Sequence, residues 1–214
     1  TDFSPSAEIA VRRAGAVAQG CDGVLEIIHV LSRRDTPVYR VTGWAENRRA
    51  VEAEAMRKLR GLASRARARF GISVHPELVR GSPQREIAAY AASIGASLVV
   101  VGPNGDHAVR DMLIGSTAQR LQRALRVPLL IARNRLVRAY RRVLVTTDFS
   151  RASAEAARTA ATLFPRAELH FVHACNVWFA TRAPRAGPGR AEIAAHPKQI
   201  LLDAESDLDD FIRT

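Results

Sequence analysis

Short apolar runs alternate with helical patterns along the first two thirds of this chain. Apolar runs lie at residues 25–30, 98–101 and 127–132, and a segment of alternating apolar positions lies at 72–79. Runs of this length, separated by segments with apolar residues at helical spacing, are typical of strands in a parallel sheet. The pattern therefore predicts an α/β fold in which helices cover both faces of a doubly wound parallel sheet.

The helices between these strands are predicted from their apolar faces and their end signals. The long pattern at 45–70 repeats apolar residues on one face, and Gly71 stops it. Ser82 and Pro83 form a helix start, with the serine as N-cap and the proline in the first turn. The predicted helices cover residues 6–19, 45–70, 83–94, 115–126, 152–163 and 191–213.

A repeat divides the chain. The sequence Thr-Asp-Phe-Ser at residues 1–4 recurs at 147–150, and each copy precedes an alanine-rich helix and a strand that ends near a histidine, His29 or His173. Repetition of order, spacing and a four-residue identity predicts two copies of one unit. Residues 142–146 form a strand before the second motif, whereas the first copy begins at the motif. We therefore expect the first strand of copy one to be missing from the chain as given.

The repeat also predicts the domain boundaries. Residues 1–136 form the first domain, and residues 137–214 correspond to the first half of a second domain. Nothing that corresponds to residues 72–133 follows in the second copy. A lone strand–helix–strand–helix exposes unpaired strand edges, so we expect this half to pack against copy one or another chain.

A glycine-rich loop follows the buried strand at 98–101. The segment 102–105 reads Gly-Pro-Asn-Gly, and Gly115, Ser116 and Thr117 open the next helix. Glycine permits positive φ angles and close approach of a ligand to the main chain. Unpaired amides and the dipole at a helix start favour a phosphate, so the spacing fits an anion site, although turn glycines explain it equally well. The chain contains neither a P-loop nor a G-x-G-x-x-G motif after a strand.

The spacing G-x2-G-x9-G-[ST] resembles the nucleotide-binding motif of the universal stress protein family, in its ATP-binding branch. The resemblance extends over essentially the whole chain, as one nearly complete domain and the first half of a second. It implies a Rossmann-like, adenine nucleotide alpha-hydrolase-like fold with a five-stranded parallel sheet in the order 3-2-1-4-5. It also implies ATP as the ligand, with or without Mg²⁺.

The resemblance further implies the residues of the site. Asp2, beside Thr1, matches the position that contacts the nucleoside, and Val30 matches the position that lines the adenine pocket. Asp148 and Ala174 are the corresponding positions of the second copy. No catalytic or metal-binding residue is assigned. The implied nucleotide-binding residues are Thr1, Asp2, Val30, Val101, Gly102, Asn104, Gly105, Gly115, Ser116 and Thr117.

Several of these residues, and their neighbours, have structural alternatives. Asp2 and Asp148 are also suited to capping the helix that follows. His29 and His173 occupy the same place in both copies, which favours a structural role over a catalytic one. Arg110 is suited to holding a phosphate or to facing solvent. The acidic and histidine residues of the loop fit no metal spacing and favour a solvated lid loop: Asp106, His107 and Asp111.

Composition limits the function classes. The chain has 214 residues with 47% hydrophobic and 25% charged residues, typical of a soluble globular protein. It shows no apolar run near the ~20 residues that span a bilayer and no secretory leader pattern. The net charge of +11 comes from arginines dispersed along the chain, aromatic residues are 6%, and no nucleic-acid motif occurs, which argues against nucleic-acid binding. Two distant cysteines, Cys21 and Cys175, predict a cytoplasmic setting.

Three functions remain open at this stage. The first is a nucleotide-dependent regulatory module of a stress response, and the second is a slow ATPase, at most a weak hydrolase, because no catalytic base or Walker-type acid is recognisable. The third is a nucleotide-free dimerising scaffold. The strand at 127–132 should lie at a sheet edge and is expected to be covered, through a homodimer or by pairing between tandem copies.

Overall fold

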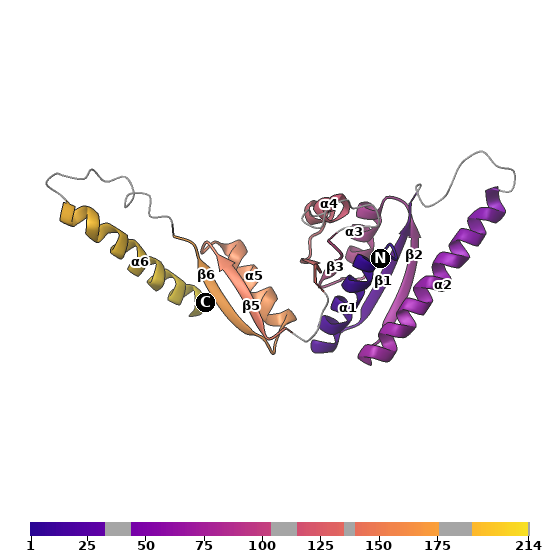
Figure 1. Cartoon of the computed structure of the whole chain (residues 1–214), viewed down its shortest axis with the longest axis horizontal. Helices are drawn as coiled ribbons and strands as arrows, with labels where there is room; N and C mark the ends of the chain where they lie inside the picture. Colours follow the sequence, from indigo (N-terminus) through magenta and orange to yellow (C-terminus); the bar gives the residue numbers. More distant parts are fainter. Residues whose placement is uncertain (33–43, 104–114, 135–139, 176–189, 214) are drawn as a thin grey trace. The chain divides into compact units, whose positions relative to one another are not determined.

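The computed structural model describes residues 1–32, 44–103, 115–134, 140–175 and 190–213, in two compact units, Thr1–Ala139 and Tyr140–Thr214. Figure 1 shows the helices and strands of each unit. The first contains α1 (Pro5–Gly20), β1 (Leu25–Leu31), α2 (Trp44–Phe70), β2 (Val74–Arg80), α3 (Pro83–Ser93), β3 (Val99–Val101), α4 (Ser116–Ala124) and β4 (Leu129–Ile131). The second contains β5 (Arg142–Thr147), α5 (Arg151–Leu163), β6 (Glu168–His173) and α6 (Arg190–Arg213).

The described strands form three parallel pairs: β1 with β2, β3 with β4, and β5 with β6. The predicted α/β class with parallel strands is therefore confirmed. The first two pairings agree with the outer pairs of the order 3-2-1-4-5, since β1 and β2 correspond to its second and third strands and β3 and β4 to its fourth and fifth. The complete five-stranded order stays a prediction.

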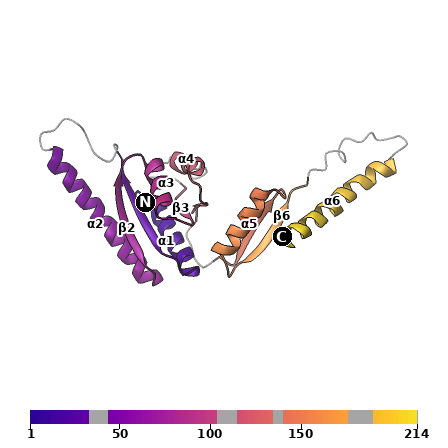
Figure 2. The ribbon, with the colours of Figure 1, turned by 180° about the vertical axis from the view of Figure 1, so that it is seen from behind.

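The core of the first unit lies between α1, α2 and the β1–β2 pair, along which α2 runs (Figures 1 and 2). Leu59 and Val74 are fully buried there. Gly15 of α1 is needed at this point, because a Cβ would overlap the ring of Phe70. The buried face of α2 is the predicted one: Ala55, Leu59, Leu62, Ala63 and Ala66.

The opposite face of β1 is covered by α3. Glu26 alternates along the strand with the core residues Leu25 and Ile27, so its side chain lies on the other face. The hydroxyl group of Tyr90, from α3, donates to the Glu26 carboxylate at 3.2 Å. Helices therefore cover both faces of β1, as expected for a doubly wound sheet.

The helix ends agree with most of the predicted signals. Gly71 and Gly95 have φ angles of +65° and +61°, the left-handed conformation that ends a helix and that glycine adopts most readily. Ser82 is the N-cap of α3, as predicted, but its side chain accepts no cap hydrogen bond. Its carbonyl oxygen instead accepts from the Glu86 amide at 3.0 Å, and Pro83 still begins the helix.

The two Thr-Asp-Phe-Ser segments have the same local geometry. Phe3 and Phe149 have φ angles of 66° and 63°, and their rings lie 4.4 and 4.2 Å from the rings of His29 and His173. In each segment the serine side chain caps the following helix by accepting a backbone amide, at 3.2 Å in both cases. This local repeat is observed, whereas the assignment of residues 137–214 to half of a second domain stays a prediction.

Candidate functional site

The first part of the candidate site is the turn at residues 1–4, beside the carboxyl end of β1. The Thr1 nitrogen donates to the Ile28 carbonyl oxygen at 2.7 Å, and Nδ1–H of His29 donates to the Thr1 carbonyl oxygen, also at 2.7 Å. These bonds fix Thr1 alongside the residues that precede Val30. His29 thus holds the turn in place, and His173 makes the same bond to Thr147 at 2.8 Å. The structural role expected of both histidines is confirmed.

The Asp2 carboxylate accepts hydrogen bonds within this turn. Its Oδ1 atom accepts from the Ser4 amide at 3.0 Å and from the Ser4 hydroxyl group at 2.6 Å. Burial raises the pKa of Asp2, but the hydrogen bonds from Ser4 outweigh it, so that the pKa lies below its ordinary value. Asp148 accepts from the Ser150 amide at 3.0 Å in the same way. The prediction that these aspartates cap the helices is wrong, because Ser4 and Ser150 are the N-caps. Each aspartate instead accepts from the amide of the capping serine.

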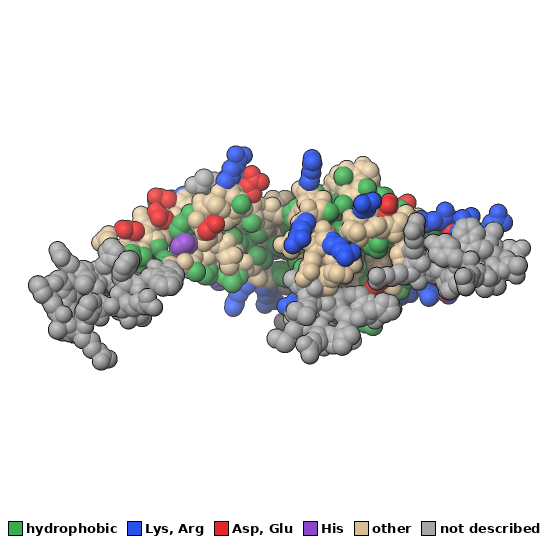
Figure 3. All heavy atoms as spheres, turned by 90° about the horizontal axis from the view of Figure 1, so that it is seen from above, with side chains coloured by type: hydrophobic (Ala, Val, Ile, Leu, Met, Phe, Trp, Pro, Cys, Tyr) green, Lys and Arg blue, Asp and Glu red, His purple; other side chains and the backbone are tan. Residues whose placement is uncertain are grey.

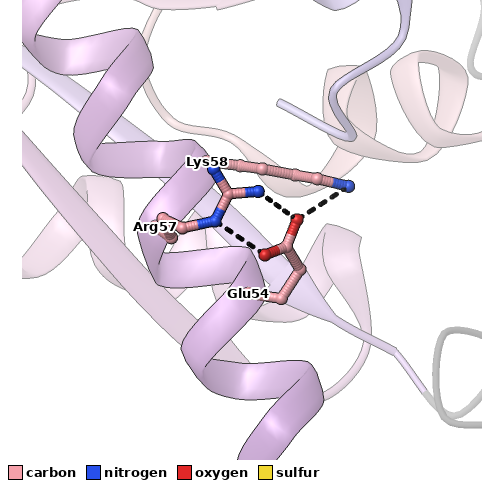
Figure 4. A network of polar contacts seen from close by, with 3 residues as sticks. All are labelled: Glu54, Arg57 and Lys58. Atoms are coloured by element: carbon pink, nitrogen blue, oxygen red, sulfur yellow. Dashed lines mark hydrogen bonds and ion pairs between the residues drawn. The ribbon is translucent and has the colours of Figure 1, made fainter.

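A cation from α2 lies close to the turn. The Lys58 ammonium group lies 5.9 Å from the centroid of the Phe3 ring, within the range of a cation–π contact. Lys58 also shares the Glu54 carboxylate with Arg57, at 3.7 and 2.6 Å (Figure 4). Such an exposed network contributes little stability, but it places positive charge next to the residue that follows Asp2.

The second part of the site is Gly102, at the carboxyl end of β3. A Cβ at this position would lie 2.9 Å from the carbonyl carbon and oxygen of Ser6, in the first turn of α1. Gly102 does not use the positive φ angle that glycine permits, because among the described glycines positive φ is found at Gly71, Gly81 and Gly95. The glycine instead permits close approach of β3 to α1.

The third part is the start of α4. The Gly115 amide donates to the Pro103 carbonyl oxygen at 2.7 Å, so this amide is already paired, contrary to the expectation that it is free. Gly115 acts as N-cap with no side-chain cap bond, and Ser116 and Thr117 are exposed in the first turn. The first amides of a helix have no partner within the helix and favour an anion.

The described residues of the site therefore lie along one edge, at the carboxyl ends of the strands. Thr1 adjoins β1, Ser6 adjoins Gly102, and Pro103 connects Gly102 to Gly115. Sequence reasoning did not single out Ser6, and no signal could have found it, because its role is a backbone contact made only in the folded chain. The predicted residues Asn104 and Gly105, and the loop residues Asp106, His107, Arg110 and Asp111, lie outside the described residues.

The chemistry available at this edge is that of binding. Main-chain amides at a helix start and the hydroxyl groups of Ser116 and Thr117 suit an anion. Within the part of the chain that the structure describes, no group of three His, Cys, Asp or Glu side chains could hold a metal ion.

Comparison with known proteins shows the family. Residues 1–133 match the sequence model of the universal stress protein family. The chain belongs to the universal stress protein family. Universal stress protein MJ0531 of Methanocaldococcus jannaschii is 30% identical over 80 residues, 37% of this chain and 45% of that protein. Universal stress protein YxiE of Bacillus subtilis is 31% identical over 88 residues, 41% of this chain and 59% of that protein.

A solved structure supports the fold of this universal stress protein. A universal stress protein from Archaeoglobus fulgidus DSM 4304 has a TM-score of 0.62 and 19% sequence identity, over 96% of this chain and 72% of that one. At this level of identity the similarity shows a common Rossmann-like α/β fold. The matched segments span about half the length of the two curated relatives, 45% and 59%, so function comes to this chain as a proposal.

Two further features of this universal stress protein concern its surface charges and its helices. Lys and Arg side chains lie in several separate groups on the face that Figure 3 presents, as expected from their dispersion along the sequence. Among the helices that the structure describes, none is long and apolar enough to cross a membrane.

Proposed function

We propose that this universal stress protein binds ATP and acts as a nucleotide-dependent regulatory module in a stress response. The observation that carries the proposal is the meeting of the two predicted halves of the site at one sheet edge. The turn at residues 1–4 lies beside β1, and Ser6, two residues beyond it, contacts Gly102 at the end of β3. Ligands of open α/β sheets bind at this edge.

In the proposed complex the adenosine lies between the ends of β1 and β3, and the phosphates lie at the start of α4. Thr1, Asp2 and Val30 line the nucleoside. Mg²⁺, where present, would be held through the phosphate oxygens of the nucleotide, as is usual for this ion. The residues proposed for the ribose and the phosphates are Val101, Gly102, Asn104, Gly105, Gly115, Ser116 and Thr117.

A valine at residue 115 tests the site. Gly115→Val adds a branched side chain at the N-cap of α4, where the phosphates would lie, and we expect it to weaken ATP binding at least about tenfold, measured by calorimetry. Gly20→Val is the matched control, because Gly20 ends α1 and a Cβ there meets nothing within 4 Å. Unchanged affinity in Gly115→Val, with both variants folded, would refute the site.

The species released when the purified protein is denatured identifies the natural ligand among ATP, ADP and AMP. Phosphate release from added ATP then separates the regulatory module from the slow ATPase. Sustained phosphate release at several turnovers per second would show that the protein is an enzyme and not a regulatory module. Absence of any bound or binding adenine nucleotide would favour the nucleotide-free scaffold.

Two features of organisation complete the proposal. We infer that residues 137–214 are the first half of a second universal stress domain, supported by the matching geometry of Phe3 and Phe149 and by a solved relative that aligns with 96% of this chain. We also infer a cytoplasmic location, with which the free thiol groups of Cys21 and Cys175 agree.

A further inference from the structure

Arg133 leaves β4 next to the glycine loop. In the β3–β4 pair, Val101 is level with Ile131, and the Ala132 amide donates to the Val101 carbonyl oxygen at 2.8 Å. Continuing this parallel register by two residues places Arg133 beside Pro103, directly after Gly102. The Arg133 side chain is exposed. The backbone of Arg133 therefore lies at the same sheet edge as the residues of the proposed nucleotide site.

The start of α4 adjoins the same point. The Pro103 carbonyl oxygen, beside Arg133, accepts the Gly115 amide at 2.7 Å. The N-terminal end of α4, whose first amides have no partner within the helix, is therefore joined through the Gly115–Pro103 hydrogen bond to the residue beside Arg133. A guanidinium group and a helix N-terminus favour the same ligand, an anion, and their effects on a phosphate add.

A buried contact fixes the chain at this position. Arg13 of α1 is only 8% exposed, and its Nη2 atom donates to the carbonyl oxygen of Asn134 at 2.7 Å. Asn134 directly follows Arg133, so α1 holds the backbone where the chain leaves β4. This hydrogen bond from α1 therefore holds the backbone next to Arg133 in place.

The sequence around Arg133 is strongly positive. From Met112 to Thr147 the chain contains eight arginines and no aspartate or glutamate. The chain has no P-loop lysine to neutralise a polyphosphate. The segment that contains β4 therefore carries a positive formal charge.

We infer that Arg133 binds the phosphate chain of the nucleotide and makes the site prefer nucleotides with more phosphate groups. This inference rests on the proposed nucleotide site and adds to it the residue that distinguishes ATP from AMP. A guanidinium group donates two parallel hydrogen bonds to phosphate oxygens, which a lysine does not reproduce. Arg133 is exposed, so substitutions there should leave the fold intact.

The test compares three nucleotides on four proteins. Affinities for ATP, ADP and AMP are measured by calorimetry for the wild type, Arg133→Ala, Arg133→Lys and Arg126→Ala. Arg126 is the matched control: it is exposed, carries the same charge and precedes β4, at the opposite end of the strand. We expect Arg133→Ala to weaken ATP binding about tenfold or more and AMP binding less than threefold, because a hydrogen bond to a charged group is lost.

Arg133→Lys should lie between the wild type and Arg133→Ala for ATP, and Arg126→Ala should match the wild type for all three nucleotides. The inference is overturned if Arg133→Ala keeps the wild-type affinity for ATP, if it weakens the three nucleotides equally, or if Arg126→Ala has the same effect. A wild type that binds none of the three overturns the proposed function itself, and the inference with it. Thermal unfolding of each variant verifies that a lost affinity does not come from a lost fold.

Discussion

Glu26 is shared by two hydrogen-bond donors on the face of β1 that α3 covers. Nδ1 of His75, on β2, lies 2.7 Å from one carboxylate oxygen, and the Tyr90 hydroxyl group donates to the other at 3.2 Å. Burial, and then the charge of Glu26, raise the pKa of Tyr90 to about 12. The Glu26 carboxylate would repel a Tyr90 phenolate, so the folded state favours the neutral form of Tyr90.

This arrangement predicts a loss of stability at high pH. At pH values below the ordinary tyrosine pKa of about 10, Tyr90 is neutral in the folded and in the unfolded state. Its neutral form then contributes its full stabilisation of the fold. As the pH rises from 10 to 12, the unfolded chain ionises first, and the free energy of unfolding falls. Solvent screening at this partly exposed site limits the effect to the order of 1 kcal/mol.

Urea unfolding of the wild type and of Tyr90→Phe, at pH 8 and at pH 11.5, measures this effect. Each protein is compared with its own value at pH 8, because the phenylalanine also removes the hydrogen bond to Glu26. Tyr90→Phe should lose less unfolding free energy than the wild type between the two pH values. Equal losses in both proteins would show that Tyr90 is not responsible.

At the scale of elements, α2 gives the first unit most of its core. Leu59 of α2 is fully buried, whereas its neighbour Arg60 faces solvent. We expect Leu59→Ala to lower the free energy of unfolding by about 2–5 kcal/mol, because a leucine side chain is lost and a cavity remains. Arg60→Ala, the matched control, should change it by about 0.5 kcal/mol or less. If chemical unfolding gave similarly small changes in the free energy of unfolding for both variants, Leu59 would not be packed in the core.

The elements were largely predictable because their signals are local. The buried face of α2 follows from residue spacing, and Gly71 ends the helix as its sequence position suggests. The missing side-chain cap of Ser82 and the contact of Gly102 with Ser6 were not predictable, since both depend on tertiary placement. The residues of the candidate site stay a prediction, and the close approach of Gly102 to Ser6 was visible only in the structure.

At the scale of the whole molecule, the feature that bears on assembly is the second edge of β4, since among the described residues β4 pairs with β3 alone. The β3–β4 ladder uses the carbonyl oxygen of Pro128 and the amide of Ala132. Because bonding alternates along a parallel strand, the amides of Leu129 and Ile131 point away from β3. Such an edge is a template for another strand. We therefore propose that two chains dimerise through β4.

Ile131→Pro tests this dimer without breaking the β3–β4 ladder. Proline removes an amide that points away from β3, so the pairing between chains should weaken while the unit stays folded. We expect a dimeric wild type, a monomeric Ile131→Pro and a dimeric Ile131→Val, measured by light scattering after gel filtration. The valine variant controls for the smaller side chain. A monomeric wild type, or a proline variant that still has the dimer mass, would exclude β4 as the interface between two chains.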